Sequence, residues 1–174
     1  MKKLLIVVDY QNDFVTGSLG FEGAKAIESA ICDKIRSYQK AGGHVVYTLD
    51  THHPDYADTQ EGKKLPVPHC IKDTAGWQLY GDVAHMLQGC RCFEKNTFGS
   101  AALLDFLRAE ENQYTVIELC GVVTNICVIS NAVLAKAAQP EAEIVIDRQC
   151  VAGADEEMNQ KTFEVLKGLQ VTVL

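Results

Sequence analysis

Near-continuous aliphatic runs of strand length recur along the chain, separated by polar or glycine-containing segments. Such runs are typical of strands that are buried on both faces of a sheet. The clearest are KKLLIVVD (2–9), HVVYTLD (44–50), YTVIELC (114–120) and AEIVID (142–147), and the weaker ones are RCFEK (91–95) and QVTVL (170–174). The pattern therefore predicts six strands.

Amphipathic segments lie between these runs. The stretch 23–43 places Ile27, Ile31, Ile35 and Tyr38 on one helical stripe and stops at two glycines. Further helices are expected at 77–88, 100–111, 124–138 and 155–169. Strands that alternate with helices predict an α/β protein, a three-layer α/β/α sandwich around a six-stranded parallel, Rossmann-like sheet. Since no repeat or linker divides the chain, we expect a single domain over 1–174.

The composition is that of an ordinary globular protein. The chain has 174 residues, of which 47% are hydrophobic and 22% charged, and it has no apolar stretch of membrane-spanning length. The net charge of −7 comes without a cluster of Lys and Arg, which argues against a nucleic-acid partner and favours a small-molecule substrate. No membrane partner is expected.

The cysteines indicate a reducing compartment. There are seven, an odd number, and they form no paired CxxC motifs. The N-terminus resembles a buried strand more than a signal peptide, because acidic residues follow the apolar run at once. We therefore expect a cytoplasmic protein with free thiols. Cys90 and Cys92 are interpreted as packing residues, and small buried hydrophobic roles are expected for Cys32, Cys70, Cys120 and Cys150.

Chemically active side chains fall at the carboxyl ends of the predicted strands. Asp9, Asp50 and Lys95 end the first three strands, and the fourth runs through Gly121 into the turn that carries Cys127. Ligands of open parallel sheets bind at this edge. Although Asp9 alone would suit a turn cap and Lys95 alone a surface position, their coincidence with Cys127 predicts a nucleophilic triad of thiol, carboxylate base and orienting cation. A helix N-terminus and a cation are expected to lower the thiol pKa of Cys127.

The polar segment 51–70 is long enough to indicate a functional loop. Together with the end of the second strand it offers four metal-ligand side chains: Asp50, His52, Glu61 and His69. In Asp50-Thr51-His52 the carboxylate and the imidazole are two residues apart, so both can point the same way from an extended strand end. Mixed imidazole and carboxylate donors suit zinc, iron(II) or manganese. Spacing alone leaves three rival ligands open: His53, Asp55 and Asp58.

Three motifs together resemble the cysteine hydrolases of the isochorismatase-like superfamily, and within it the nicotinamidases. They are VVDYQNDFV with Asp9, EKNTFGS with Lys95 and GVVTNICV with Cys127, in the family's order, and the resemblance covers essentially the whole chain. It implies that Cys127 attacks an amide carbonyl, that Asp9 takes the thiol proton and that Lys95 holds the ion pair. It also implies an oxyanion site at the N–H groups of Val123 and Cys127, a cis peptide bond between Val122 and Val123, and a homo-oligomer.

The resemblance also bears on the metal and the substrate. It implies one divalent ion, zinc first and iron or manganese next, held by Asp50, His52, Glu61 and His69 and bound to the pyridine nitrogen of nicotinamide. The usual aromatic stacking residue of nicotinamidases corresponds here to Pro66, so Phe14 and Phe98 are the candidate aromatic walls. The resemblance thus implies a nicotinamidase, also acting on pyrazinamide, in NAD salvage.

Two other functions compete with this one. The first is a related amidase that acts on a carbamoyl or ureido compound without a metal. The second is a binding or scaffold protein with an inactive site, which the intact set of Asp9, Lys95 and Cys127 opposes. Metal dependence distinguishes the first from a nicotinamidase, and the reactivity of Cys127 distinguishes the second.

Overall fold

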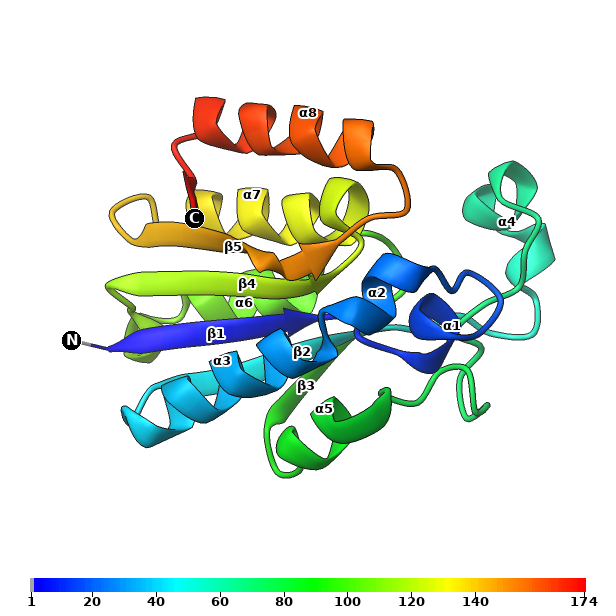
Figure 1. Cartoon of the computed structure of the whole chain (residues 1–174), viewed down its shortest axis with the longest axis horizontal. Helices are drawn as coiled ribbons and strands as arrows, with labels where there is room; N and C mark the ends of the chain where they lie inside the picture. Colours follow the sequence, from blue (N-terminus) through cyan, green and yellow to red (C-terminus); the bar gives the residue numbers. More distant parts are fainter. Residues whose placement is uncertain (1) are drawn as a thin grey trace.

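A single six-stranded parallel sheet forms the centre of the molecule, as predicted (Figure 1). The computed structural model describes residues 2–174. The strand order is β3-β2-β1-β4-β5-β6. Strands β2 and β3 are added on one side of β1 and β4, β5 and β6 on the other, so the strand order reverses between β1 and β4. The strands are β1 (Lys3–Val8), β2 (His44–Asp50), β3 (Arg91–Lys95), β4 (Val116–Val122), β5 (Glu143–Ala152) and β6 (Thr172–Val173).

Helices cover both faces of the sheet. One face carries α2 (Glu22–Ala26), α3 (Glu28–Lys40) and α5 (Gly81–Met86), and the other carries α6 (Ala101–Arg108), α7 (Ile129–Ala138) and α8 (Glu156–Gly168). The short helices α1 (Asn12–Val15) and α4 (Gln60–Lys64) lie beyond the carboxyl ends of the strands (Figure 1). Short helical turns occur at η1 (Tyr56–Asp58), η2 (Glu110–Asn112) and η3 (Thr124–Val128).

Alternation along β1 explains the two layers of core. Leu4, Ile6 and Val8 belong to the apolar cluster beneath α6, α7 and α8, whereas Leu5 and Val7 belong to the cluster beneath α2, α3 and α5. Because successive side chains of a strand point to opposite faces, a continuous aliphatic run fits only a strand that is covered twice. This is why β1 occupies the middle of the sheet.

Several boundaries differ from the sequence prediction, and the helix expected over 77–88 is helical only over Gly81–Met86. The stretch 23–43 forms two helices that meet at Ile27 (φ −87°, ψ −1°), a turn residue whose side chain is buried. The fifth strand continues past residue 147 to Ala152, beyond an irregularity in its pairing with β4. Residues 124–128 form a π-helical turn that precedes α7, so the helix expected over 124–138 is α-helical only in its second part.

The cysteine prediction is confirmed. All seven thiols are free, and Cys32, Cys70, Cys120 and Cys150 are buried in apolar surroundings. Cys90 and Cys92 are half-buried at the start of β3. Within residues 2–174, no helix is both long and apolar enough to cross a lipid bilayer.

Candidate active site

The carboxyl edge of the sheet brings the predicted reactive residues together. Asp50 and Lys95 are register partners at the ends of β2 and β3, and Asp9 directly follows β1. Gly121 of β4 (φ +111°) lies so close to β1 that an added Cβ would stand 2.1 Å from the Val8 carbonyl oxygen. Only glycine permits this approach. The approach carries the turn bearing Cys127 toward Asp9.

Asp9, Lys95 and Cys127 form one buried cluster. Lys95 Nζ lies 2.7 Å from Asp9 Oδ2 and 3.5 Å from Cys127 Sγ. Thr48 Oγ1 donates a hydrogen bond of 2.6 Å to Asp9 Oδ1, which fixes the carboxylate. All three members of the cluster are at least 94% shielded from solvent, so their charges interact in a low-dielectric setting.

The electrostatics of the cluster favour a protonated thiol in the free protein. Burial, together with the Asp9 carboxylate, raises the pKa of the Cys127 thiol well above its usual range, although Lys95 opposes this shift. The prediction of a lowered thiol pKa is therefore wrong, because it considered the cation and the helix terminus but not the burial. Burial also raises the pKa of Asp9, against the opposing charge of Lys95. A carboxyl group with a raised pKa is suited to accept and return a proton.

The turn before Cys127 exposes backbone donors. The Val122–Val123 peptide bond is cis, as the resemblance implied. In the π-helical turn the Val123 carbonyl accepts hydrogen bonds from Ile126 N–H and Val128 N–H, at 3.0 and 3.1 Å. Within residues 2–174, neither Val123 N–H nor Cys127 N–H donates to a side chain or to a loop carbonyl. These two N–H groups beside the thiol are therefore the candidate donors to an oxygen of a ligand.

The four predicted metal ligands form a second cluster beside the first. Their donor atoms all lie within 4.8 Å of one another. His52 Nε2 and His69 Nε2 are 3.1 and 3.3 Å from Asp50 Oδ2, and they are 3.7 and 3.6 Å from Glu61 Oε1. Two imidazoles and two carboxylates converging on one point fit a divalent transition-metal ion. The rival candidates His53, Asp55 and Asp58 are exposed and lie outside this cluster.

Asp50 connects the two clusters. Its Oδ2 faces the two histidines, and its Oδ1 lies 3.2 Å from Lys95 Nζ. Burial alone would raise the pKa of Asp50, but hydrogen bonds from His52 and His69 and the charge of Lys95 hold it below its usual range. Asp50 is thus an anion, the form that binds a cation.

The histidine donors are pre-oriented. His69 Nδ1 lies 2.8 Å from the Val67 carbonyl oxygen, which can only accept, so Nδ1 carries a proton and Nε2 is left to hold either a second proton or an ion in the cluster. Burial lowers the pKa of His69, but the hydrogen bonds with Asp50 and Val67 and the charges of Asp50 and Glu61 together outweigh it, so the pKa is raised overall. An ion would therefore compete with a proton at His69.

Three supporting residues were not predicted from the sequence. Gln11 holds the Asp50 backbone at both ends, because its Nε2 donates to Asp50 O and its Oε1 accepts from Asp50 N–H, at 2.9 and 2.8 Å. The buried ring of Tyr56 packs against both histidines, with centroid distances of 4.7 Å to His52 and 5.1 Å to His69. The third is Thr48, which contacts Asp9. The only sequence signal for Tyr56 was an aromatic residue in an otherwise polar loop.

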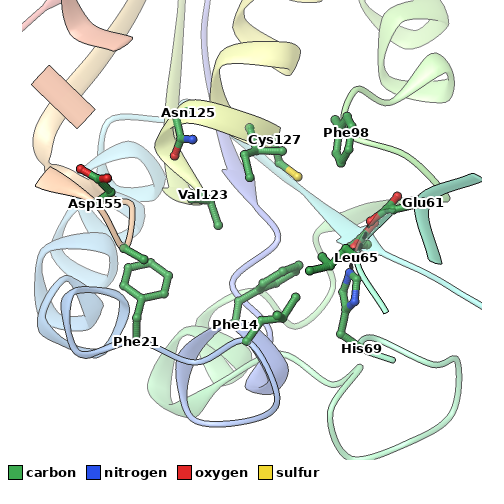
Figure 2. Close-up of a pocket in the computed structure, with 14 residues that line it drawn as sticks. Phe14, Phe21, Glu61, Leu65, His69, Phe98, Val123, Asn125, Cys127 and Asp155 are labelled. Carbon is green, nitrogen blue, oxygen red and sulfur yellow. Dashed lines mark ion pairs between the residues drawn. The ribbon is translucent and has the colours of Figure 1, made fainter. Parts of the chain in front are cut away.

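A pocket of about 270 Å³ opens onto both clusters (Figure 2). Asp50, Glu61 and His69 line one part of it, and Cys127 and Val123 line the middle. The predicted walls Phe14 and Phe98 both line the pocket, and Phe98 is 45% exposed. Pro66 does not line it. Its neighbour Leu65 does, so an aliphatic side chain stands where an aromatic ring was expected.

The chain is similar over nearly its whole length to known proteins. The isochorismatase domain model matches residues 3–174. An uncharacterized isochorismatase family protein, PncA of Bacillus subtilis, is 35% identical over 90% of each chain. The crystal structure of the nicotinamidase/pyrazinamidase PncA from Bacillus subtilis superposes with a TM-score of 0.87, at 29% identity over 99% of each chain. A pyrazinamidase of Pyrococcus horikoshii in complex with zinc gives a TM-score of 0.86, at 25% identity over 100% of this chain and 99% of the other.

Proposed function

The chain belongs to the isochorismatase family and is an amidohydrolase, and from this premise we propose that it hydrolyses nicotinamide, and also pyrazinamide, to the acid and ammonia. The observation that carries the proposal is the shared pocket. A thiol with its acid-base partner and a four-donor metal cluster open onto the same cavity, and Asp50 contacts both. A pyridine carboxamide has one group for each: a ring nitrogen for the ion and a carbonyl carbon for the thiol.

In the first half of the reaction, Cys127 is the nucleophile. Asp9 accepts the thiol proton as Sγ attacks the amide carbonyl, and the raised pKa of Asp9 suits this role. Lys95, 3.5 Å from Sγ and 2.7 Å from Asp9, stabilises the thiolate as it forms. The C–N bond then breaks, the nitrogen takes the proton from Asp9, and ammonia leaves behind a thioester.

In the second half, water replaces the nitrogen. Asp9 accepts a proton from the water as its oxygen attacks the thioester, the C–S bond breaks, and the thiol of Cys127 is reprotonated. In both halves the carbonyl oxygen becomes an oxyanion. The N–H groups of Val123 and Cys127 are the donors we assign to it, and one such donor is typically worth about 3–4 kcal/mol of transition-state stabilisation.

A divalent ion held by Asp50, His52, Glu61 and His69 would bind the ring nitrogen and so orient the carboxamide over the thiol. The donor set favours zinc, with iron or manganese as alternatives. Phe14 and Phe98 would contact the two sides of the ring, and Leu65 would replace the usual stacking aromatic. The product, nicotinate, would feed NAD salvage.

The test is release of ammonia and nicotinate from nicotinamide by purified protein, with chelator and with re-added zinc, iron or manganese. We expect metal-dependent release, and we expect none from Cys127→Ala, whereas the control Cys90→Ala alters a half-buried thiol away from the pocket and should stay active. A protein that is inactive on nicotinamide with every metal but hydrolyses a ureido compound in chelator would contradict the proposal and support the metal-independent amidase.

A further inference from the structure

The pocket extends past the thiol on the side away from the metal cluster (Figure 2). Glu61, His69 and Phe98 lie to one side of Cys127. On the opposite side, a second arm of the pocket is lined by Phe21, Asn125 and Asp155. A pyridine carboxamide that reaches from the metal cluster to the thiol fills only the first side. The second arm is therefore available to a further part of a larger substrate.

The geometry of the reacting carbon determines what the second arm faces. A carbonyl carbon carries its three substituents in a plane, directed to the corners of a triangle. With the ring toward the metal cluster, the oxygen and the amide nitrogen are both directed away from that cluster, the oxygen toward the N–H groups of Val123 and Cys127 and the nitrogen into the remaining space. This is the side on which Asn125 and Asp155 lie (Figure 2).

The polar groups of this arm have hydrogen-bonding capacity to spare. The side-chain amide of Asn125 makes no hydrogen bond within residues 2–174, in contrast to Asn131 of the following helix, which bonds to the Cys127 and Phe98 carbonyls and to Ser100 N–H. Asp155 Oδ1 accepts a hydrogen bond from Met158 N–H at 3.0 Å. The carboxylate has no ion-pair partner among residues 2–174. Asp155 gives the arm a negative charge.

We propose that this arm is a leaving-group subsite and that the enzyme also hydrolyses N-substituted pyridine carboxamides whose amine portion carries a cationic or hydrogen-bond-donating tail. Asn125 and Asp155 are then specificity-determining residues, with Phe21 as an apolar wall. The inference rests on the proposed function. The chemistry is unchanged: the C–S bond forms, the C–N bond breaks, the proton carried by Asp9 goes to the nitrogen, and a primary amine leaves in place of ammonia.

The experiment measures nicotinate formation from three compounds with the metal-loaded enzyme. They are nicotinamide, N-(aminopropyl)nicotinamide and its uncharged isostere N-butylnicotinamide. We expect both substituted amides to be hydrolysed and kcat/KM to be higher for the aminopropyl compound. Asp155→Asn should lower the aminopropyl-to-butyl ratio about two- to fivefold, the range for one solvent-exposed charge pair. Asparagine also caps helices well, so α8 should remain intact.

Two further variants complete the test. Asn125→Ala should lower kcat/KM for the aminopropyl compound relative to nicotinamide by about two- to tenfold, the effect of one hydrogen bond. Glu157→Gln is the matched control, since it removes a charge from the same helix outside the pocket and should leave the aminopropyl-to-butyl ratio unchanged. Hydrolysis of nicotinamide without hydrolysis of either substituted amide overturns the subsite and identifies the arm as a solvent path. Failure with all three compounds overturns the proposed function and the subsite with it.

Discussion

Replacing Lys95 by methionine tests the central ion pair, because methionine keeps much of the side-chain volume and removes only the charge. Lys95 is 6% exposed, and its ammonium lies 2.7 Å from Asp9 and 3.2 Å from Asp50. The variant leaves two buried carboxylates without their cation. Breaking a buried pair in this way typically costs about 3–5 kcal/mol, so we expect the free energy of unfolding at neutral pH to fall by that amount.

The loss should depend on pH in a definite direction. Burial already raises the pKa of Asp9 above its ordinary value of 3.8, and Lys95 is the charge that opposes this shift. Without Lys95 the folded-state pKa rises further, so an ionised Asp9 destabilises the variant at every pH above that value. As the pH falls toward the ordinary carboxyl range, Asp9 is protonated and the destabilisation shrinks.

The assay is urea unfolding of the metal-free protein at several pH values, with an unchanged slope as the sign of a pure stability effect. Lys72→Met is the control, because it removes an ammonium from a surface pair with Glu94 at 2.6 Å and should cost only a small fraction of the loss in Lys95→Met. Equal losses in the two variants, or a loss in Lys95→Met that does not change with pH, would refute the reasoning.

Three other predictions concern the metal cluster and the thiol. His52→Ala removes one of four donors, so metal content after dialysis should fall well below one ion per chain, and an undiminished content would exclude His52 as a ligand. Tyr56→Leu removes the ring that packs on both histidines, so chelator competition should detect metal affinity about tenfold weaker, and wild-type affinity would show that this ring does not orient the ligands. Alkylation of Cys127 in the metal-free protein should still accelerate above pH 9, the ordinary thiol pKa here, because its own pKa is raised; a plateau near neutral pH would contradict the electrostatic argument.

The fold was predictable because its signal is local. An aliphatic run such as 2–9 can bury all its side chains only in a strand that is covered on both faces. The stripe of Ile31 and Ile35 requires an apolar partner on one side of a helix. Boundaries were less predictable. The break at Ile27 and the extension of β5 to Ala152 depend on packing and strand pairing between segments distant in sequence.

The sequence predicted which residues lie together in the site but not how the site shifts their pKa values. The carboxyl ends of parallel strands lie at one edge of the sheet, so Asp9, Asp50 and Lys95 could be grouped from the sequence alone. The sign of the Cys127 pKa shift could not be, because it depends on how deeply the thiol is buried and on its distance from Asp9. Desolvation depends on the folded environment and cannot be predicted from residue spacing.

The sequence by itself thus determined the order of strands and helices, the layered architecture and the residues available for chemistry. The reason is that hydrophobic periodicity and the positions of strand ends are local features of the sequence. Only the tertiary structure decided that Asp50 faces both Lys95 and the histidines, that Gln11 holds its backbone, that Leu65 rather than residue 66 lines the pocket, and that Asn125 and Asp155 line it as well. These features join side chains from segments far apart in sequence, and their distances are set by the packing of the whole sheet.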